Sequence, residues 1–303
     1  MVKHVVESEQ FDRDYLSKLF RRADFLRNNP EQTLKGKILT TLFYEPSTRT
    51  RLSFESAMLR LGGNIIGTED AKAFSSASKG ETLIDTIRII SKYCDAIVLR
   101  HNTEGSSKRA SVISDVPVIN AGDGRGQHPT QTMLDLYTIE REIGRVDNLK
   151  IAMVGDLANG RTVRSLCYML GKFRNVEVFF VSPENLKIGQ DIKDYLERHN
   201  VMFSEKDNLN HVLSKIDVVY MTRIQKERME LKDYEKAKGN FILDEKNLHL
   251  VKDGSIIMHP LPHVEEIDFP ASIEETDRRI AYFRQAENGL FIRMAILEDL
   301  MLG

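Results

Sequence analysis

Short apolar runs alternate along the chain with longer segments in which apolar residues recur at helical spacing. In the first half, the runs predict strands over Ile38–Phe43, Asn64–Gly67, Ala96–Leu99 and Val116–Asn120. The helical spacing predicts helices over Phe11–Arg27, Thr50–Leu61, which Gly62 and Gly63 end, and Glu81–Tyr93. This alternation is typical of βαβ units that build a parallel sheet.

The pattern restarts after a long predicted helix over Pro129–Ile143, which ends at Gly144. Strands are predicted over 150–155, 176–181, 217–221 and 255–258, with helices over 162–173 and 188–199 and a closing helix over about 285–302. We therefore predict an α/β protein with two doubly wound parallel-sheet domains, residues 1–133 completed by a C-terminal helix 285–303, and residues 134–284. Helix 129–143 would bridge them, and the active site would lie in the cleft between them.

Composition narrows the class of protein. The chain has 303 residues, enough for roughly two domains, and its 41% hydrophobic and 29% charged residues are typical of globular proteins. The net charge of −2 argues against bulk attraction to nucleic acid or to an anionic membrane. Only two cysteines occur, Cys94 and Cys167, and we expect two buried, unbridged thiols in a reducing compartment. With no signal-like or membrane-spanning apolar stretch, a cytoplasmic protein is expected.

Cationic residues follow the predicted strands. Ligands bind at the carboxyl ends of strands in open parallel sheets, and here those positions hold residues 47–51, Arg100-His101 and residues 122–128 in the first half. In the second half they lead to Arg161, to Arg223 and to residues 259–263. A protein of almost neutral net charge that gathers arginine and histidine at one edge of each sheet is suited to bind anions. Two such edges predict two anionic ligands that meet in the cleft.

The segment Ser47-Thr48-Arg49-Thr50 is the sharpest candidate anion site. It follows a strand and opens a helix, where free backbone N–H groups and the positive end of the helix dipole favour phosphate. Hydroxyl groups and a guanidinium would complete the site. The alternative is that Ser47 is a plain N-cap and the arginines are solvated.

His128 precedes Pro129, the expected first residue of the long helix, and Gln131 follows in the first turn. A neutral imidazole donates one hydrogen bond without carrying charge, so His128 is a candidate donor to a carbonyl oxygen. The alternative is a merely structural histidine.

Other site classes fit the sequence poorly. Glycines 122, 124 and 126 lack the GxGxxG spacing of a dinucleotide site, and no phosphate-binding GxxxxGK[ST] motif occurs. Histidines 101, 128, 259 and 263 lie in separate segments without zinc-ligand spacing, and no GxSxG or Cys/His pairing suggests covalent catalysis. We therefore expect neither a metal nor a cofactor.

Several strings resemble the catalytic chains of the aspartate carbamoyltransferase family, in the family's order and over nearly the whole chain. They are FYEPSTRTRLSFESAMLRLGG (43–63), SSASKGET (75–82), LRH (99–101), HPTQTMLDLYTI (128–139), GDLANGRTVRSL (155–166), MTRIQKER (221–228), HPLP (259–262) and FRQAENGLFIRMAIL (283–297). The related ornithine carbamoyltransferases share the STRTR and HPxQ elements. They carry a cysteine in place of Leu261 and an SMG loop that this sequence lacks.

The resemblance implies a role for each matching residue. Carbamoyl phosphate would be bound by Ser47, Thr48, Arg49, Thr50, Ser75, Arg100, His128, Gln131, Leu261 and Pro262, and L-aspartate by Lys79, Arg161, Arg223, Gln225 and Leu261. In the family, the serine and the lysine that match Ser75 and Lys79 come from a neighbouring subunit, which implies a homotrimer with shared active sites. Regulatory subunits as further partners stay open.

The implied reaction belongs to pyrimidine biosynthesis. The α-amine of L-aspartate attacks the carbamoyl carbon, and phosphate leaves. Thr50, Arg100 and His128 would stabilise the tetrahedral oxyanion, and Arg49 and Lys79 the departing phosphate. Positioning and preorganised charge would supply most of the rate.

The sequence departs from the family at three places. His263 follows HPLP where arginine is usual, Asn102 replaces the proline of RHP, and Ser78 stands before Lys79 at a variable position. His263 would either help to hold the substrate carboxylate as a cation or pack and pair with Glu265 or Glu266. It leaves open a carbamoyltransferase with another amino-acid acceptor. A catalytically silent, anion-binding homologue is the remaining alternative.

Overall fold

The computed structural model describes residues 2–71, 80–223 and 241–303. The chain divides into two compact units, the first formed by Met1–Leu134 with Ala286–Gly303 and the second by Asp135–Gln285. The chain crosses between the units within the long helix after residue 128 and again within the C-terminal helix. The predicted divisions at residues 133 and 285 lie beside these positions.

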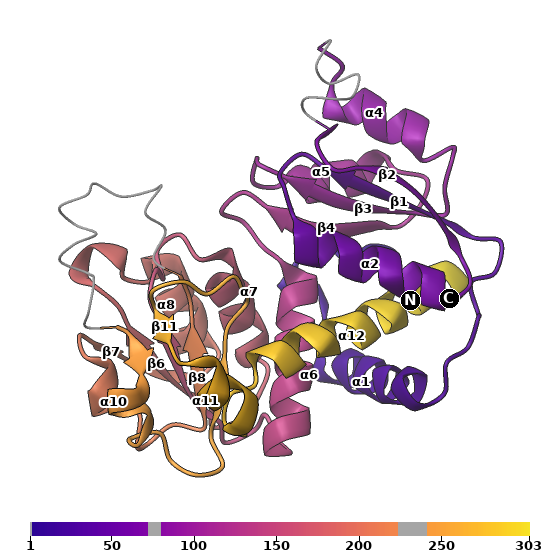
Figure 1. Ribbon diagram of the computed structural model, residues 1–303. Coiled ribbons are helices and arrows are strands. Elements are labelled where there is room, and N and C mark those ends of the chain that lie inside the picture. The colour runs from indigo at the N-terminus through magenta and orange to yellow at the C-terminus, as the bar shows by residue number, and fades with distance from the viewer. Residues whose placement is uncertain (1, 72–79, 224–240) are drawn as a thin grey trace. The chain divides into compact units, whose positions relative to one another are not determined.

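The first unit contains a parallel sheet with the strand order β2-β1-β3-β4 (Figure 1). The strands are β1 (Ile38–Phe43), β2 (Asn64–Thr68), β3 (Ala96–His101) and β4 (Val118–Asp123). Its helices are α1 (Arg13–Asn28), α2 (Thr48–Arg60), α4 (Leu83–Ile90), α5 (Ser106–Ile113), the first part of α6 (Pro129–Ile143) and most of α12 (Tyr282–Leu302), with the 3₁₀ turn η1 (Ser8–Gln10).

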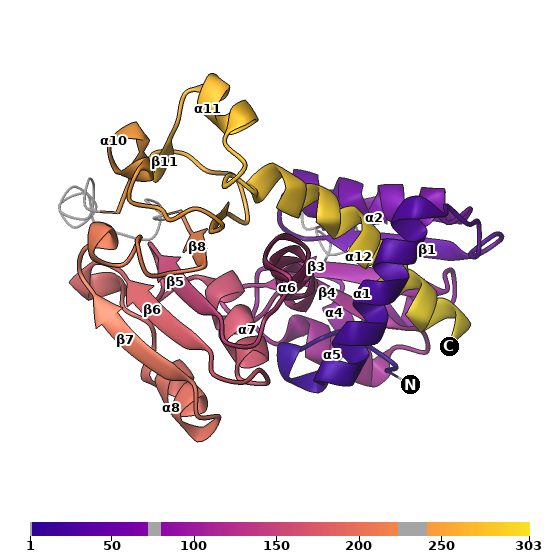
Figure 2. The same ribbon diagram turned by 90° about the horizontal axis from the view of Figure 1, so that it is seen from below.

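The order of strands places the helices of this unit on both faces of its sheet. The chain runs from β1 to β2 on one side and then returns past β1 to β3 and β4, and right-handed crossovers carry these two paths over opposite faces. In Figure 2, α2 lies on one side of the sheet and α5 on the other. A cluster of buried residues that includes Leu42, Ile87, Leu99 and Ala110 fills the α4 and α5 side.

Local chemistry fixes the ends of these helices. The side chain of Asp12 accepts a hydrogen bond from the backbone N of Tyr15 at 2.8 Å and caps the start of α1. At the end of α2, Gly62 adopts φ of 81°, a left-handed conformation that glycine reaches without steric cost. The predicted stop of this helix at Gly62-Gly63 is confirmed.

The second unit contains a five-stranded parallel sheet with the order β10-β8-β5-β6-β7. Figure 2 shows β8, β5, β6 and β7 in this order. Its strands are β5 (Lys150–Val154), β6 (Glu177–Val181), β7 (Met202–Lys206), β8 (Val218–Met221) and β10 (Ile256–Met258), and a small parallel pair joins β9 (Leu243–Asp244) to β11 (Ile267–Asp268). The helical segments are the rest of α6, α7 (Arg161–Leu170), α8 (Gln190–Arg198), α10 (Glu245–Leu248), α11 (Ala271–Thr276) and the first turn of α12, with η3 (Glu184–Leu186) and η4 (Leu209–His211).

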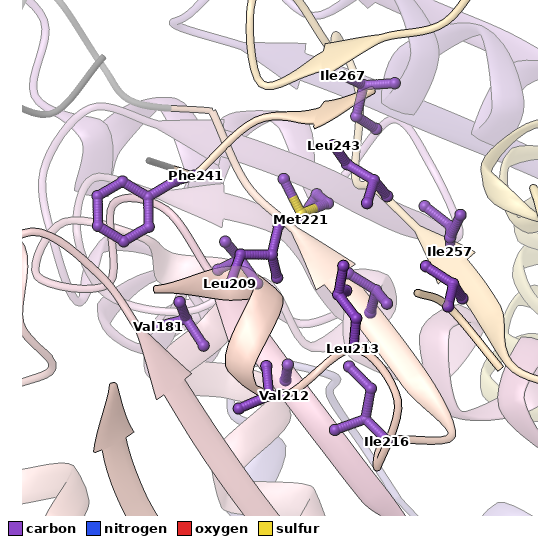
Figure 3. Packing of buried hydrophobic residues seen from close by; sticks show 14 of the residues in the cluster. Val181, Leu209, Val212, Leu213, Ile216, Met221, Phe241, Leu243, Ile257 and Ile267 are labelled. Atoms are coloured by element: carbon purple, nitrogen blue, oxygen red, sulfur yellow. The ribbon is translucent and has the colours of Figure 1, made fainter. Parts of the chain in front are cut away.

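A large apolar cluster packs against one face of this sheet. Figure 3 shows Val181, Met221 and Ile257 from the strands beside residues of the segment from η4 to Ile216. Leu243 and Ile267, from the small parallel pair, close the cluster. Burial of this kind contributes about 25 cal/mol per Å² of apolar surface.

The predicted α/β class with parallel sheets is confirmed, and several elements are added that the sequence pattern did not predict. The strand β7 lies at a sheet edge and is only partly buried, so it lacks the apolar run of the inner strands. The helix α5 begins with Ser106, Ser107 and Lys108, which give no apolar periodicity. Both cysteines are free as predicted, but only Cys167 is fully buried, and Cys94 is half-buried. Among the described helices, none is both long and apolar enough to cross a bilayer.

Candidate active site

Three neighbouring strands of the first unit deliver candidate residues to one edge of the sheet. In the parallel register, Phe43 at the end of β1 pairs with Arg100 in β3, and His101 pairs with Asp123 at the end of β4. The segments that follow these strand ends lead to Ser47 and to His128. The topology therefore brings the predicted anion-binding segments of this unit to adjacent positions, as expected for the carboxyl edge of a parallel sheet.

The first of these segments opens α2. Ser47 is the N-cap residue, but its side chain makes no capping hydrogen bond. Thr50 is buried in the first turn, and Thr48 and Arg49 are exposed. Although Arg49 is exposed overall, neighbouring protein atoms partly desolvate its guanidinium and lower its pKa, and the group remains a cation at any working pH. The N-cap alternative is thus correct about the position of Ser47, and its hydroxyl is not committed to capping.

Arg100 is anchored from both sides at the end of β3. Its side chain is 16% exposed, its Nη1 donates a hydrogen bond to the carbonyl oxygen of Ala121 at 3.3 Å, and its Nε lies 3.4 Å from Glu45 Oε2. A guanidinium held by a neighbouring strand and a carboxylate loses little conformational freedom when it binds a ligand. The arrangement suits a preorganised hydrogen-bond donor.

The loop between β4 and α6 positions His128 and Gln131. Both residues are buried, with His128 4% exposed. Asp123 closes the loop, because its Oδ1 accepts from the backbone N of Gln127 at 2.8 Å and its Oδ2 accepts from the backbone N of Gly105 at 2.9 Å. His128 therefore follows directly on a residue that a buried carboxylate fixes.

The second unit repeats this arrangement with β5, β8 and β10. Val154 pairs with Met221, and Tyr220 pairs with Met258, so the ends of these three strands lie together. They are followed by Arg161 at the start of α7, by Arg223, and by the turn over residues 259–262. Arg161 and Arg223 are both half-buried.

A glycine lets two of these segments approach closely. Gly155, directly after β5, has φ of 112°, and a Cβ there would lie 2.2 Å from the carbonyl oxygen of Thr222. Thr222 in turn donates from its backbone N and its Oγ1 to the carbonyl oxygen of Val154, at 2.8 and 2.7 Å. Only glycine fits this contact, which fixes the backbone next to Arg223 against the end of β5.

The turn after β10 carries Leu261 and Pro262. Leu261 is half-buried with φ of 55°, its peptide bond to Pro262 is cis, and Pro262 is exposed. His263 lies 3.2 Å from Glu274 through its Nε2. The sequence-based pairing of His263 with Glu265 or Glu266 is therefore corrected to Glu274, which comes from α11, and Glu266 contacts His259 instead.

Three predicted residues, Ser75, Lys79 and Gln225, lie outside the described residues. Within the described ranges, no group of three or more histidine, cysteine, aspartate or glutamate side chains could hold a metal ion. Sequence reasoning missed the buried polar side chains that support the site, among them Asp123 and Asp135. An aspartate inside an apolar run, as Asp135 is between Leu134 and Leu136, was the available signal.

Comparisons with known proteins identify the family of this chain. A family model described as "Aspartate/ornithine carbamoyltransferase, carbamoyl-P binding domain" matches residues 3–141, and one described as "Aspartate/ornithine carbamoyltransferase, Asp/Orn binding domain" matches residues 147–300. The chain belongs to the aspartate/ornithine carbamoyltransferase family. The range that each model matches contains the candidate residues at the carboxyl edge of one of the two parallel sheets.

Members of the family that resemble this chain come from distant organisms. "Aspartate carbamoyltransferase 2, chloroplastic" of Pisum sativum is 56% identical, over 99% of this chain and 79% of its own length. The catalytic subunit of Methanocaldococcus jannaschii aspartate transcarbamoylase is a structural match with a TM-score of 0.91 and 49% identity, covering 99% of this chain and 98% of that chain. The Trypanosoma cruzi aspartate transcarbamoylase, solved in complex with carbamoyl phosphate and aspartate, has a TM-score of 0.91 at 38% identity, covering 97% and 94%.

Proposed function

We propose that this chain transfers the carbamoyl group of carbamoyl phosphate to the α-amine of L-aspartate, giving N-carbamoyl-L-aspartate and phosphate, a reaction of pyrimidine biosynthesis. The observation that carries the proposal is that each unit gathers arginines at the carboxyl edge of its sheet. A family relative of 38% identity is solved with both of these substrates, which supports the same pair here.

The first unit binds carbamoyl phosphate in this proposal. Ser47, Thr48, Arg49 and Thr50 at the start of α2 hold the phosphate, because helix N-terminal N–H groups, hydroxyls and a guanidinium all favour an anion. Arg100, His128 and Gln131 surround the carbamoyl group in this proposal. The resemblance to the family adds Leu261 and Pro262 to the residues that bind carbamoyl phosphate.

The second unit binds L-aspartate. A dicarboxylate is best held by two guanidinium groups, and Arg161 and Arg223 follow neighbouring strands. Gln225 and Lys79 complete the set in this proposal. Ornithine carries only one carboxylate and an additional amine, which makes two arginines a poor match for its side chain.

The reaction needs no redox step. The α-amine nitrogen of aspartate forms a bond to the carbamoyl carbon, the carbon–oxygen bond to phosphate breaks, and phosphate leaves with that electron pair while the amine loses a proton. Thr50, Arg100 and His128 donate hydrogen bonds to the carbamoyl oxygen as it gains negative charge. Arg49 and Lys79 stabilise the leaving phosphate.

We further propose that the active form is a cytoplasmic homotrimer in which Ser75 and Lys79 reach the site of a neighbouring subunit. The shared site of a trimer is proposed from the resemblance of SSASKGET (75–82) to the family. Mixing Arg49→Ala chains with Lys79→Ala chains tests the shared site, because some interfaces then combine an intact Arg49 with an intact Lys79. Each variant alone should keep only a small residual activity, and the mixture should be far more active than either. An inactive mixture after verified subunit exchange would contradict sharing.

The proposed substrates are tested by incubating the protein with carbamoyl phosphate and a panel of amino acids while phosphate release is measured. L-aspartate should stimulate release far more than L-ornithine, L-asparagine or L-glutamate. Stimulation by another amino acid would support the alternative acceptor that His263 leaves open. No stimulation by any of them, from a folded protein, would support a silent anion-binding homologue.

A further inference from the structure

Buried polar side chains hold the turn that carries Leu261 and Pro262. His259 directly follows β10 and is 2% exposed. Its Nδ1 accepts a hydrogen bond from the backbone N of Leu261 at 2.7 Å. On the other side of the ring, its Nε2 lies 2.9 Å from Oε1 of Glu266, which is 6% exposed. The imidazole thus spans the space between the turn and a buried carboxylate.

Leu261 needs such support because its backbone is unfavourable. Its φ of 55° lies in the left-handed region, which residues other than glycine, asparagine and aspartate rarely adopt. A conformation of this kind persists only where the surrounding structure fixes it. The hydrogen bond from the Leu261 N–H to His259 is a direct constraint on that backbone.

The same contacts define the tautomer of His259. Since Nδ1 accepts an N–H, the ring proton lies on Nε2, facing Glu266. Burial by itself would raise the pKa of Glu266, but the contact with His259 and the backbone N–H of Val264 outweigh it, and the pKa is lowered. Of the two neutral tautomers, a carboxylate beside Nε2 favours the one that carries its proton on Nε2, and this tautomer leaves the lone pair of Nδ1 to accept the Leu261 N–H.

The base of the turn is fixed as well. The backbone N of His259 donates to Gln285 Oε1 at 2.9 Å, and Gln285 Nε2 donates to Asp135 Oδ1 at 2.6 Å. The other carboxylate oxygen of Asp135 accepts from the Tyr220 hydroxyl at 2.8 Å. Tyr220 lies in β8, the strand that leads to Arg223. One buried network therefore links the turn after β10 to the strand before a candidate aspartate ligand.

We propose that His259 is a positioning residue for carbamoyl transfer, which orients the Leu261 backbone toward the carbamoyl group, and that Glu266 holds the required tautomer of His259. This inference rests on the proposed function for the role of Leu261. His259 itself contacts no substrate. Its effect passes through the turn.

Two variants separate the two sides of the imidazole. In His259→Asn, the side-chain oxygen replaces Nδ1 and still accepts the Leu261 N–H, while the contact with Glu266 is lost. In His259→Gln, the longer amide replaces Nε2 and still reaches Glu266, while the acceptor for Leu261 is lost. Each variant removes one of the two contacts of the same buried imidazole. A general loss of packing would therefore affect both variants alike.

We expect both variants to lower the thermal unfolding temperature by similar amounts. His259→Asn should retain kcat/KM for carbamoyl phosphate within about threefold of the unsubstituted protein, and His259→Gln should lose about tenfold or more, in line with the cost of leaving one buried N–H unpaired. Equal losses in the two variants, or a larger loss in His259→Asn, would overturn the proposal.

Hydrogen exchange at the Leu261 amide gives a readout that does not depend on activity. Exchange should be slow in the unsubstituted protein and in His259→Asn and faster in His259→Gln. If the unsubstituted protein transfers no carbamoyl group, the proposed function fails, and exchange still reports on the turn. If neither histidine variant folds, Glu266→Gln takes their place. We then expect faster exchange at the Leu261 amide and a raised KM for carbamoyl phosphate. Unchanged values of both would contradict the proposal.

Discussion

Asp123 holds the loop that precedes His128, and we expect its replacement to lower both the stability and the activity of the protein. Its buried carboxylate accepts two backbone hydrogen bonds, from Gln127 at 2.8 Å and from Gly105 at 2.9 Å. In Asp123→Asn, the amide oxygen can accept only one of these without a clash between an NH₂ group and the other N–H. Hydrogen bonds to charged groups contribute about 1.5–3 kcal/mol each, so we expect the free energy of unfolding to fall by about 2–3 kcal/mol.

The catalytic effect follows from the place of this loop in the chain. His128 comes directly after Gln127, whose N–H is one of the two groups that Asp123 fixes. Small displacements of a positioned group can reduce rates up to a hundredfold, and we expect a loss of about tenfold in kcat/KM for carbamoyl phosphate, equivalent to about 1.4 kcal/mol. The KM for L-aspartate should change less, because the second unit supplies most of its proposed ligands.

Urea unfolding followed by circular dichroism, and initial-rate kinetics on the same preparations, measure the two effects. Asp115→Asn is the matched control, because Asp115 is an exposed aspartate of the same unit whose partner is Lys92. Exposed pairs of this kind contribute little, and no measurable change is expected. If Asp123→Asn unfolds at the same urea concentration as Asp115→Asn and keeps its activity, the assigned role of this loop is wrong.

Three further predictions concern other parts of the molecule. Arg49→Ala should cost about 3 kcal/mol of transition-state stabilisation, measured as kcat/KM for carbamoyl phosphate, whereas Arg60→Ala, an exposed arginine at the end of the same helix, should leave it unchanged. Burial favours a raised pKa for Asp217, but hydrogen bonds from a lysine, a backbone N–H and an arginine lower it. The ionised carboxylate of Asp217 therefore stabilises the fold fully above its unfolded-state pKa of about 3.9. The difference in urea midpoint between the unsubstituted protein and Asp217→Asn should shrink as the pH falls below about 4. A difference that stays constant from pH 6 to pH 3 would refute the assigned role of Asp217. His263→Arg should keep the contact with Glu274, so the KM for aspartate should follow parallel curves from pH 6 to pH 9 in both proteins, and diverging curves would indicate that the charge of His263 acts on the substrate.

The sequence pattern predicted the bounds of an element most accurately where most of its residues are buried. The strand β1 and the helix α6 begin and end at the predicted residues, Ile38–Phe43 and Pro129–Ile143. The residues of β1 are almost all buried, and its sequence combines four apolar residues with two β-branched threonines, a composition typical of an inner parallel strand. The edge strand β7 has only two apolar residues in five, because solvent reaches much of it, and the pattern did not predict it.

The candidate site could be predicted as a set of residue types at strand ends, but its supporting contacts could not. His263 pairs with Glu274 rather than with its sequence neighbours Glu265 or Glu266, because α11 brings Glu274 to the turn. Likewise, the link between Asp135 and Gln285 joins residues 150 positions apart. Pairings of this kind depend on how the chain folds back, and residue spacing contains no information about them.

The central claim, carbamoyl transfer to L-aspartate, is tested most directly by identifying the product. The protein is incubated with carbamoyl phosphate labelled with ¹³C in the carbamoyl group and with equal concentrations of L-aspartate and L-ornithine, and the labelled products are separated and identified by mass spectrometry. The label should appear in N-carbamoyl-L-aspartate, in a one-to-one ratio with released phosphate, and Arg223→Ala should abolish it. Label in citrulline, or phosphate released without any carbamoylated amino acid, would contradict the proposed function.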